Sequence, residues 1–221
     1  MSEPREPWLA WPGGKHLRFA AMLAVIGFAW FRLIFRSADA ITASRETHWH
    51  VHLPAELALP LVPDAIVVYL SIELLFAIAP FVLRQRRPLV AFAVAANTAT
   101  LIAGILFVLL PVKLAFPPPA DLGHFPKLFR LADEMNLTYN LVPSLHVTFS
   151  VLGIGALSFR CDAAGKAVLW CWAAAIAAST VLTHQHHVVD VAAGAALGWL
   201  MFRTVFLPRA TLRPVSSAAG A

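Results

Sequence analysis

Charge and cysteine are both scarce in this chain. Only 13% of its 221 residues are charged, whereas soluble domains carry roughly a quarter. The two cysteines, Cys161 and Cys171, are too few for a zinc cluster and too far apart for a redox CxxC pair. Hydrophobic residues make up 59% of the chain, and its mean hydropathy is +0.72. These values exclude an ordinary soluble protein and indicate a single integral-membrane domain over residues 1–221.

Six apolar segments approach the length of about 20 residues that a membrane helix requires. The sequence therefore predicts an all-α fold, a six-transmembrane-helix bundle over residues 19–207. A segment 1–18 precedes the bundle, and a flexible tail 208–221 follows it. The six predicted spans are about 19–35, 65–83, 89–111, 141–159, 167–182 and 188–207.

The basic residues are distributed unevenly between the two ends of these spans. Six spans place both termini on one side, and that side holds 11 of the 17 Lys and Arg residues: Arg5, Lys15, Arg18, Arg84, Arg86, Arg87, Arg160, Lys166, Arg203, Arg209 and Arg213. The positive-inside rule then predicts cytoplasmic termini in the inner (plasma) membrane. The net charge of +5 does not indicate nucleic acid as a partner, because the basic residues form no single patch.

Two short motifs lie at the predicted outer, periplasmic ends of apolar segments. The first is Pro143-Ser144-Leu145-His146, and the second ends in His186-His187-Val188-Val189-Asp190. His186 and Asp190 are four residues apart, so on a helix they share a face, and the carboxylate can fix the tautomer of the ring. A second histidine, His146, could then protonate a leaving group. Polar chemistry beside apolar helices indicates a lipid substrate in the bilayer.

These motifs resemble the second and third signatures of the type-2 phosphatidic-acid phosphatase superfamily, whose members are also built on six helices. The resemblance implies that His186 attacks phosphorus to form a phosphohistidine, while Asp190 orients His186. It implies that His146 is the general acid and later the base, and that Ser144 donates a hydrogen bond to the phosphoryl oxygens. The expected activity is that of a phosphatase or phosphotransferase for a phosphate-bearing lipid, with no metal and no cofactor.

The chain departs from the family pattern at its phosphate-binding positions. The first signature, a lysine and an Arg-Pro pair separated by six residues, is absent, because Arg87-Pro88 lies on the cytoplasmic side with Pro80 at the lysine position. Lys113 stands where the signature lysine is expected, and Ser179-Thr180 replaces the Ser-Arg pair of the third signature. Since phosphoryl transfer needs positive charge and donors around the oxygens, we expect Lys113, Arg130 and Thr183 to supply them.

Within the superfamily, the inositol phosphorylceramide synthases and their bacterial relatives resemble this chain more closely. Their Pro-Ser-Leu-His and Thr-x-x-His-x-x-x-Asp patterns are matched from Pro143 and from Thr183. Such enzymes transfer the phosphoryl-linked head group to an alcohol, so the acceptor here is either water or a second alcohol.

Three other interpretations remain open from the sequence. His187, three residues before Asp190, could replace His186 as the nucleophile. His184, His186, His187 and Asp190 could together bind zinc. In a different class, Glu73, with Asn97 as its expected partner, could make the chain a proton-coupled transporter or binding protein.

Overall fold

The structure is a computed structural model that describes residues 7–159 and 161–211. Within these residues the chain forms helices and no β-strand, which confirms the all-α prediction. The helices, in chain order, are α1 (Gly14–Ala43), η1 (Pro54–Ala58), η2 (Pro63–Ala65), α2 (Ile66–Leu70), α3 (Ile72–Val82), α4 (Arg86–Leu109), α5 (Pro126–Met135), α6 (Leu145–Ser158), α7 (Ala163–Leu182), α8 (Val188–Met201), η3 (Phe202–Phe206) and α9 (Leu207–Thr211).

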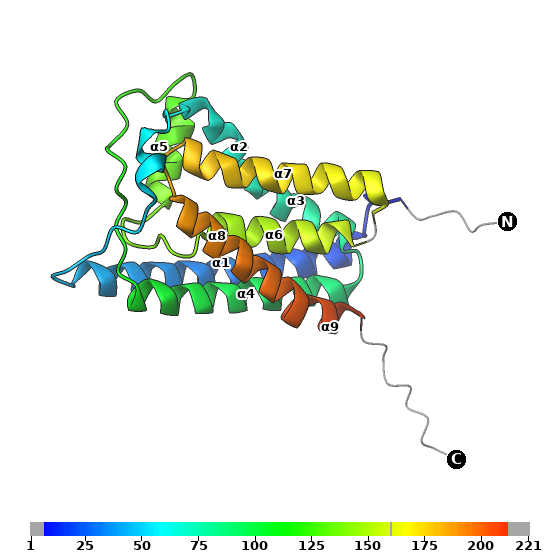
Figure 1. The fold of residues 1–221 in the computed structure, drawn as a ribbon. Coiled ribbons are helices and arrows are strands. Elements are labelled where there is room, and N and C mark those ends of the chain that lie inside the picture. The colour runs from blue at the N-terminus through cyan, green and yellow to red at the C-terminus, as the bar shows by residue number, and fades with distance from the viewer. Residues whose placement is uncertain (1–6, 160, 212–221) are drawn as a thin grey trace, which may run out of the picture.

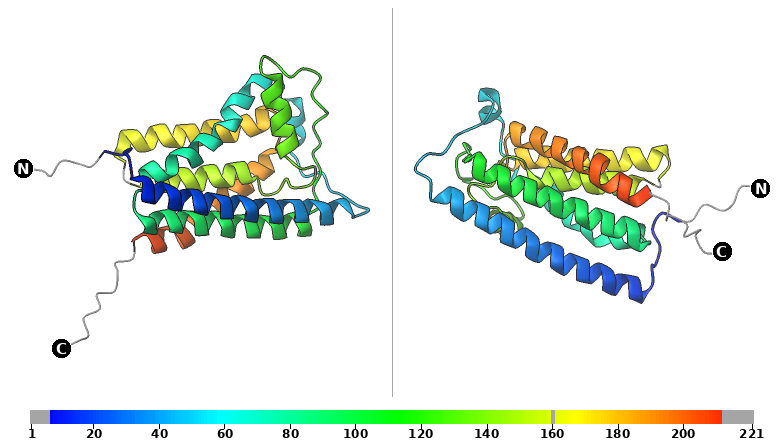
Figure 2. Two further views of the ribbon diagram at one scale, coloured as in Figure 1. Left: turned by 180° about the vertical axis from the view of Figure 1, so that it is seen from behind. Right: turned by 90° about the horizontal axis from the view of Figure 1, so that it is seen from below.

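The long helices lie side by side in one bundle, and α6 is its most enclosed element (Figures 1 and 2). Helix α6 packs against α3, α4, α7 and α8, and eleven of its fourteen residues are buried. Helix α1 packs along α4, where the missing side chain of Gly104 makes room for Ile34. Between helices in a bilayer there is no hydrophobic driving force, because lipid tails are as apolar as the side chains. Helix association then depends on close packing, which small residues such as glycine allow.

Five helical segments are long and apolar enough to cross a membrane, where six were predicted. They cover residues 14–43, 63–82, 86–109, 163–182 and 188–211. The remaining apolar helix, α6, has only 14 residues, fewer than the roughly 20 that a span requires. It starts late because Ser144 caps its first turn, so the apolar residues 141–143 before the cap are not helical.

Helix boundaries also differ from prediction at both ends of the bundle. Helix α1 is longer than the predicted 19–35, because hydropathy registers Lys15 and Arg36 as interruptions although neither breaks a helix. At the other end, α9 continues the last helix to Thr211, inside the predicted flexible tail 208–221. The rest of that tail, and residues 1–6 of the predicted N-terminal segment, lie outside the described residues.

The second predicted span is not one continuous helix. Helix α2 ends at Leu70 and α3 begins at Ile72, with Ser71 at the junction. The Ser71 hydroxyl donates to the carbonyl oxygen of Val68 at 2.6 Å and accepts the indole N–H of Trp172 at 2.8 Å. The short α2 is thereby placed against the end of α7, beside the first motif.

The connection between α4 and α6 contains a helix that the sequence reading missed. Its first part, residues 110–125, is extended and includes the proline run Pro117–Pro119. Proline has no backbone N–H to donate, so such a run does not form a regular helix. Its second part is α5, which starts with Pro126 at a position where proline is tolerated. Phe129 and Ala132 of α5 are fully buried against α2. We call residues 110–125 the strap.

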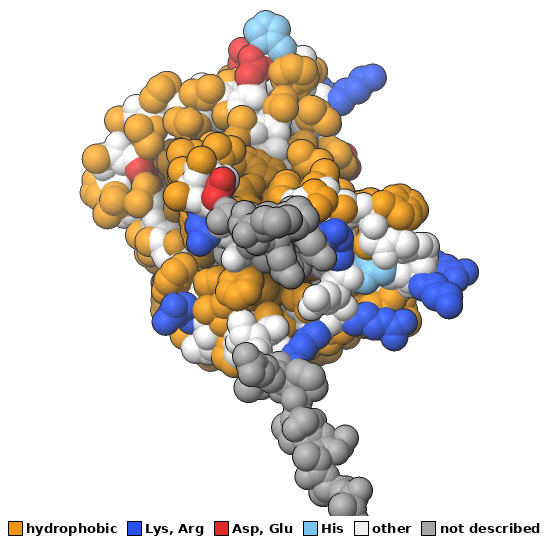
Figure 3. All heavy atoms as spheres, turned by 90° about the vertical axis from the view of Figure 1, so that its right-hand side faces the viewer, with side chains coloured by type: hydrophobic (Ala, Val, Ile, Leu, Met, Phe, Trp, Pro, Cys, Tyr) orange, Lys and Arg blue, Asp and Glu red, His pale blue; other side chains and the backbone are white. Residues whose placement is uncertain are grey.

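The two ends of the bundle differ in charge. Helix α1 begins and α9 ends at one end, whereas α5 and the strap lie at the opposite end (Figure 1). Figure 3 shows Lys and Arg side chains around the first end. The described basic residues of the elements that meet there are Lys15, Arg18, Arg84, Arg86, Arg87, Lys166, Arg203 and Arg209.

Candidate active site

The two sequence motifs meet where α6 and α8 begin, at the end of the bundle that carries α5 and the strap (Figure 1). The backbone N–H of Ser144 donates to the carbonyl oxygen of Asp190 at 3.0 Å. One turn further along, the Thr148 hydroxyl lies 2.8 Å from the carbonyl oxygen of Ser144 and 3.1 Å from that of Gly194. The helix starts are therefore joined through their main chains, and residues forty positions apart share one site.

Two glycines make this close contact between α6 and α8 possible. A Cβ atom at Gly194 would lie 2.5 Å from the carbonyl oxygen of Ser144, and one at Gly198 would lie 2.5 Å from that of Thr148. Both distances are far shorter than van der Waals contact. The Gly194-x-x-x-Gly198 pattern is thus a helix-packing face that brings the second motif against the first.

His186 and Asp190 form the predicted i, i+4 pair. Nδ1 of His186 lies 3.3 Å from Oδ2 of Asp190, and both residues are buried. The same carboxylate oxygen accepts the backbone N–H of His187 at 2.8 Å, which fixes the carboxylate at the start of α8. With Nδ1 facing a carboxylate, Nε2 is the nitrogen of His186 left to react.

His187 is engaged differently, and this distinguishes the two candidate nucleophiles. Its Nε2 accepts the backbone N–H of Ala115 in the strap at 3.0 Å, and its Nδ1 lies 3.2 Å from Oε1 of Glu56. The side chain is completely buried, and burial lowers the pKa of His187 despite the nearby carboxylates. Because both ring nitrogens face partners, His187 has no free lone pair with which to attack phosphorus.

Glu56 is a site residue that sequence reasoning missed. It is 3% exposed, and it accepts the backbone N–H groups of Leu53 at 2.6 Å and Val188 at 2.7 Å as well as facing His187. The carboxylate therefore ties the loop after α1 to the first residue of α8. A single sequence gives no signal that Glu56 contacts Val188, which is 132 residues away. The one indication is that Glu56 is an acidic residue among apolar neighbours.

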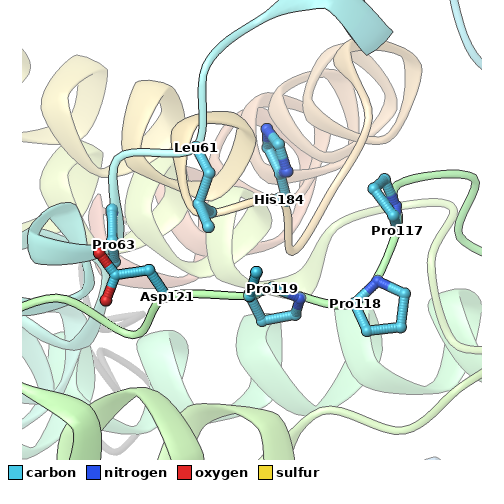
Figure 4. A pocket seen from close by; sticks show the side chains of 8 residues that line it. Leu61, Pro63, Pro117, Pro118, Pro119, Asp121 and His184 are labelled. Carbon is cyan, nitrogen blue, oxygen red and sulfur yellow. The ribbon is translucent and has the colours of Figure 1, made fainter.

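The strap covers the second motif with an aromatic ring. Phe116 stacks on His184 with ring centroids 3.9 Å apart and on His187 at 4.7 Å. His184 has a positive φ of 55°, an unusual backbone conformation for a residue with a side chain. The prolines after Phe116 line an open cavity of about 360 Å³ together with His184, Leu61 and Asp121 (Figure 4).

The histidines of the second motif do not converge on a common point. Nε2 of His184 lies 3.2 Å from the carbonyl oxygen of Leu59, whereas His186 faces Asp190 and His187 faces Glu56. Within residues 7–159 and 161–211 there is no group of three or more His, Cys, Asp or Glu that could hold a metal ion. The zinc interpretation therefore has no geometric support in this part of the chain.

His146, in the first turn of α6, is paired with a tyrosine from α2. The rings of His146 and Tyr69 stack with centroids 4.0 Å apart, and the Tyr69 hydroxyl lies 3.0 Å from Nδ1 of His146. His146 stands two residues after Ser144, whose backbone N–H is bonded to Asp190, the partner of His186. Tyr69 was not expected from the sequence, because its 77-residue separation from His146 leaves no local signal.

The four residues expected to bind phosphate are placed unequally. Ser144 and Thr183 are buried, with the Ser144 oxygen accepting the Val147 N–H and the Thr183 hydroxyl donating to the Ser179 carbonyl. Ser144 keeps its O–H hydrogen for another acceptor. Lys113, at the start of the strap, and Arg130, on α5, are exposed. Among the described residues, no hydrogen bond or ion pair joins either of these two side chains to the motifs.

Arg87-Pro88 lies far from this site, at the opposite end of the bundle, where the Arg87 guanidinium donates to the carbonyl oxygen of Arg209 at 2.7 Å. This position agrees with the prediction that Arg87-Pro88 is not the first signature of the family. The transporter interpretation gains no support, because Asn97 lies beside Gly27 of α1 while Glu73 is exposed on α3.

The model of the PAP2 superfamily matches residues 92–213, which is 122 of 221 residues and includes both motifs and the strap. The chain therefore belongs to the PAP2 superfamily, a family of phosphatases and phosphotransferases. No curated protein and no solved structure matches it. With several apolar helices, it is a multi-pass membrane protein.

Proposed function

We propose that this protein transfers the phosphoryl group of a phosphate-bearing membrane lipid through a phosphohistidine on His186. The observation that carries the proposal is the buried pairing of His186 with Asp190, directly beside the start of the helix that bears His146. A carboxylate on Nδ1 makes Nε2 more nucleophilic, and a second imidazole nearby supplies the acid.

The first step forms the bond between Nε2 of His186 and phosphorus, and it breaks the bond between phosphorus and the lipid oxygen. The lipid oxygen leaves with the bonding electrons and takes the Nε2 proton of His146. In the second step an acceptor oxygen attacks phosphorus, the phosphorus–nitrogen bond breaks, and its electrons return to His186. The proton of the acceptor passes to His146, which restores both histidines.

The position of the site supports an outer-face reaction in a bilayer. The basic residues gather at the opposite end of the bundle, and the positive-inside rule places that end in the cytoplasm. In this arrangement six passes, with α6 as the shortest, put the site at the periplasmic face of the inner membrane.

An alcohol is the second candidate acceptor, in the manner of the inositol phosphorylceramide synthases. Besides the motif pattern, the cover that Phe116 places over His187 and the complete burial of Ser144 favour it. A covered site reduces access of bulk water, and hydrolysis then competes less well with an alcohol.

Purified protein in detergent micelles, incubated with lipid phosphates and phospholipids, tests both candidates. We expect His186→Ala to abolish turnover while the protein still folds and inserts, and we expect acid-labile ³²P on the wild-type chain. Free phosphate as the sole product assigns the phosphatase, whereas a new phospholipid assigns the transferase. Undiminished turnover by His186→Ala would refute the phosphohistidine at this residue.

A further inference from the structure

We infer that Tyr69 is a positioning residue for His146, at the head of a hydrogen-bonded chain that ends on the carboxylate of Asp133. The inference rests on the proposed function, because it gives His146 the role of acid and base. It adds four residues from three separate parts of the chain, and none of them is among the catalytic or phosphate-binding residues named above.

Tyr69 is held in place independently of His146. Its side chain is fully buried, and it is the penultimate residue of α2, just before the junction at Ser71. Trp172 of α7 anchors that junction through its bond to the Ser71 hydroxyl. A rigidly held ring that stacks on an imidazole fixes the plane of the imidazole as well as one of its nitrogens.

The chain continues from Tyr69 to the surface through two amides. The Tyr69 hydroxyl lies 3.0 Å from Oδ1 and 2.8 Å from Nδ2 of Asn136, the residue that follows α5. Nδ2 of Asn136 donates to Oε1 of Gln185 at 2.6 Å, and Nε2 of Gln185 donates to Oδ1 of Asp133 at 2.7 Å. Gln185 directly precedes His186, so the chain links the segments of both histidines.

The terminal carboxylate gives the chain a direction. Asp133 only accepts hydrogen bonds when ionised, so the Gln185 amide turns its N–H toward Asp133 and its oxygen toward Asn136. Asn136 then donates to Gln185 and offers Oδ1 to the Tyr69 hydroxyl. Asn136 offers the Tyr69 hydroxyl both an acceptor, Oδ1 at 3.0 Å, and a donor, Nδ2 at 2.8 Å. A protonated His146, the form that its role as acid requires, can only donate from Nδ1, so the Tyr69 oxygen accepts Nδ1–H of His146 and the hydroxyl donates to Oδ1 of Asn136.

This direction assigns the two nitrogens of His146. The nitrogen that carries the proton is set by the hydrogen bond that its partner nitrogen makes. With Nδ1–H held by Tyr69, Nε2 becomes the reactive nitrogen, protonated before the lipid oxygen leaves and free afterwards. Asp133 thus acts on His146 through three intervening groups, as Asp190 acts directly on His186.

Tyr69→Phe tests the inference, because it keeps the stacked ring and removes only the hydroxyl. The assay compares kcat/KM for dioctanoyl phosphatidic acid, whose alkoxide leaving group needs a proton, with kcat/KM for p-nitrophenyl phosphate, whose phenolate does not. kcat/KM reports only the steps up to departure of the leaving group. The later step, in which His146 acts as a base, therefore does not affect the measured value. We expect a loss of about 10–100-fold with the lipid and less than about threefold with the nitrophenyl ester.

Two matched controls accompany this variant. Tyr139→Phe alters the other tyrosine, which stacks on His48, and should leave both substrates unaffected. Asp133→Asn should show the same pattern as Tyr69→Phe with a smaller loss, whereas Glu134→Gln, its neighbour on α5, should not. Equal losses for both substrates in Tyr69→Phe would assign Tyr69 a structural role only and overturn the inference.

A second measurement separates this inference from the proposed function. Nitrogen-15 NMR of histidine-labelled protein, recorded at a pH where His146 is neutral, identifies its tautomer, and we expect the Nδ1–H form in wild type and a mixture in Tyr69→Phe. An Nε2–H form in wild type would overturn the inference even if His186→Ala abolishes turnover. If wild type cleaves neither ester, with water or with an added alcohol as the acceptor, the proposed function fails, and the tautomer still decides whether the chain orients His146.

Discussion

The backbone N–H of Ala115 donates to Nε2 of His187 at 3.0 Å, so the strap occupies the nitrogen with which this ring could otherwise react. We therefore predict that His187→Gln, whose amide can accept from Ala115 and donate to Glu56, keeps turnover within about tenfold of wild type. His186→Gln should lower kcat by more than about 10³-fold, as loss of a covalent nucleophile does. Steady-state kinetics and ³²P trapping check both. A phosphorylated His186→Gln chain would instead assign the nucleophile to His187.

Glu56 should contribute to stability through the donors that it satisfies. Glu56→Ala leaves the backbone N–H groups of Leu53 and Val188 without their acceptor, and one such unpaired buried group costs about 1–3 kcal/mol. Glu56→Gln keeps one acceptor and should lose less. Thermal unfolding in detergent should give melting temperatures that decrease from wild type to Glu56→Gln to Glu56→Ala. The exposed Glu134→Ala serves as control, and a similar loss there would show that the effect is not specific to Glu56.

The depressed pKa of His187 predicts a stability that falls in acid. Burial lowers this pKa from its ordinary 6.5, so the unfolded chain takes up a proton at a higher pH than the folded chain. The contribution of neutral His187 is fully present above about pH 6.5 and is lost as pH falls toward the lower folded value. The melting temperature of wild type should therefore drop more between pH 7 and 5 than that of His187→Gln. Parallel curves would argue against this assignment.

The parts of the site that the sequence predicts depend on local spacing. His186 and Asp190 are one helical turn apart, and their contact follows from helix geometry alone once α8 is recognised. The alternation of apolar spans then places His146 at the same end of the bundle. Even α5 had a readable signal, since Pro126 stands at its start and Phe129 and Ala132 are three residues apart on its buried face.

The residues that support the histidines could not be predicted in this way. Each of them contacts a partner far away in the sequence. Tyr69 is 77 residues from His146, Glu56 is 132 residues from Val188, and Asn136 is 49 residues from Gln185. Such contacts depend on how helices pack and where α2 is interrupted, and neither is encoded in spacing along one chain. Hydropathy likewise cannot show that residues 141–143 are not helical, because their composition is apolar whether or not the backbone is helical.

The glycines of α8 should be required for the two motifs to meet. Gly194→Ala places a methyl group 2.5 Å from the carbonyl oxygen of Ser144, so α6 and α8 must separate and the bond from Ser144 to Asp190 must lengthen. We predict a destabilisation of about 1–3 kcal/mol, as overpacking typically costs, with a larger fractional loss of turnover. Thermal unfolding and kinetics measure both. Ala196→Leu, on the exposed side of the same helix, is the control, and equal sensitivity there would contradict this packing role.

Lys113 should supply positive charge to the phosphoryl oxygens in place of the missing signature arginines. Lys113 is exposed at the start of the strap. Two residues later, Ala115 is hydrogen-bonded to His187, so the backbone that carries the flexible Lys113 side chain is held beside the site. Lys113→Ala should lower kcat/KM by about 10–100-fold, because a charge aimed at the transition state is lost, while Lys113→Arg should retain most of it. Lys166→Ala removes another exposed lysine, at the other end of the bundle, and should have no effect. Equal rates for Lys113→Ala and Lys166→Ala would leave phosphate binding to Ser144, Thr183 and the imidazoles.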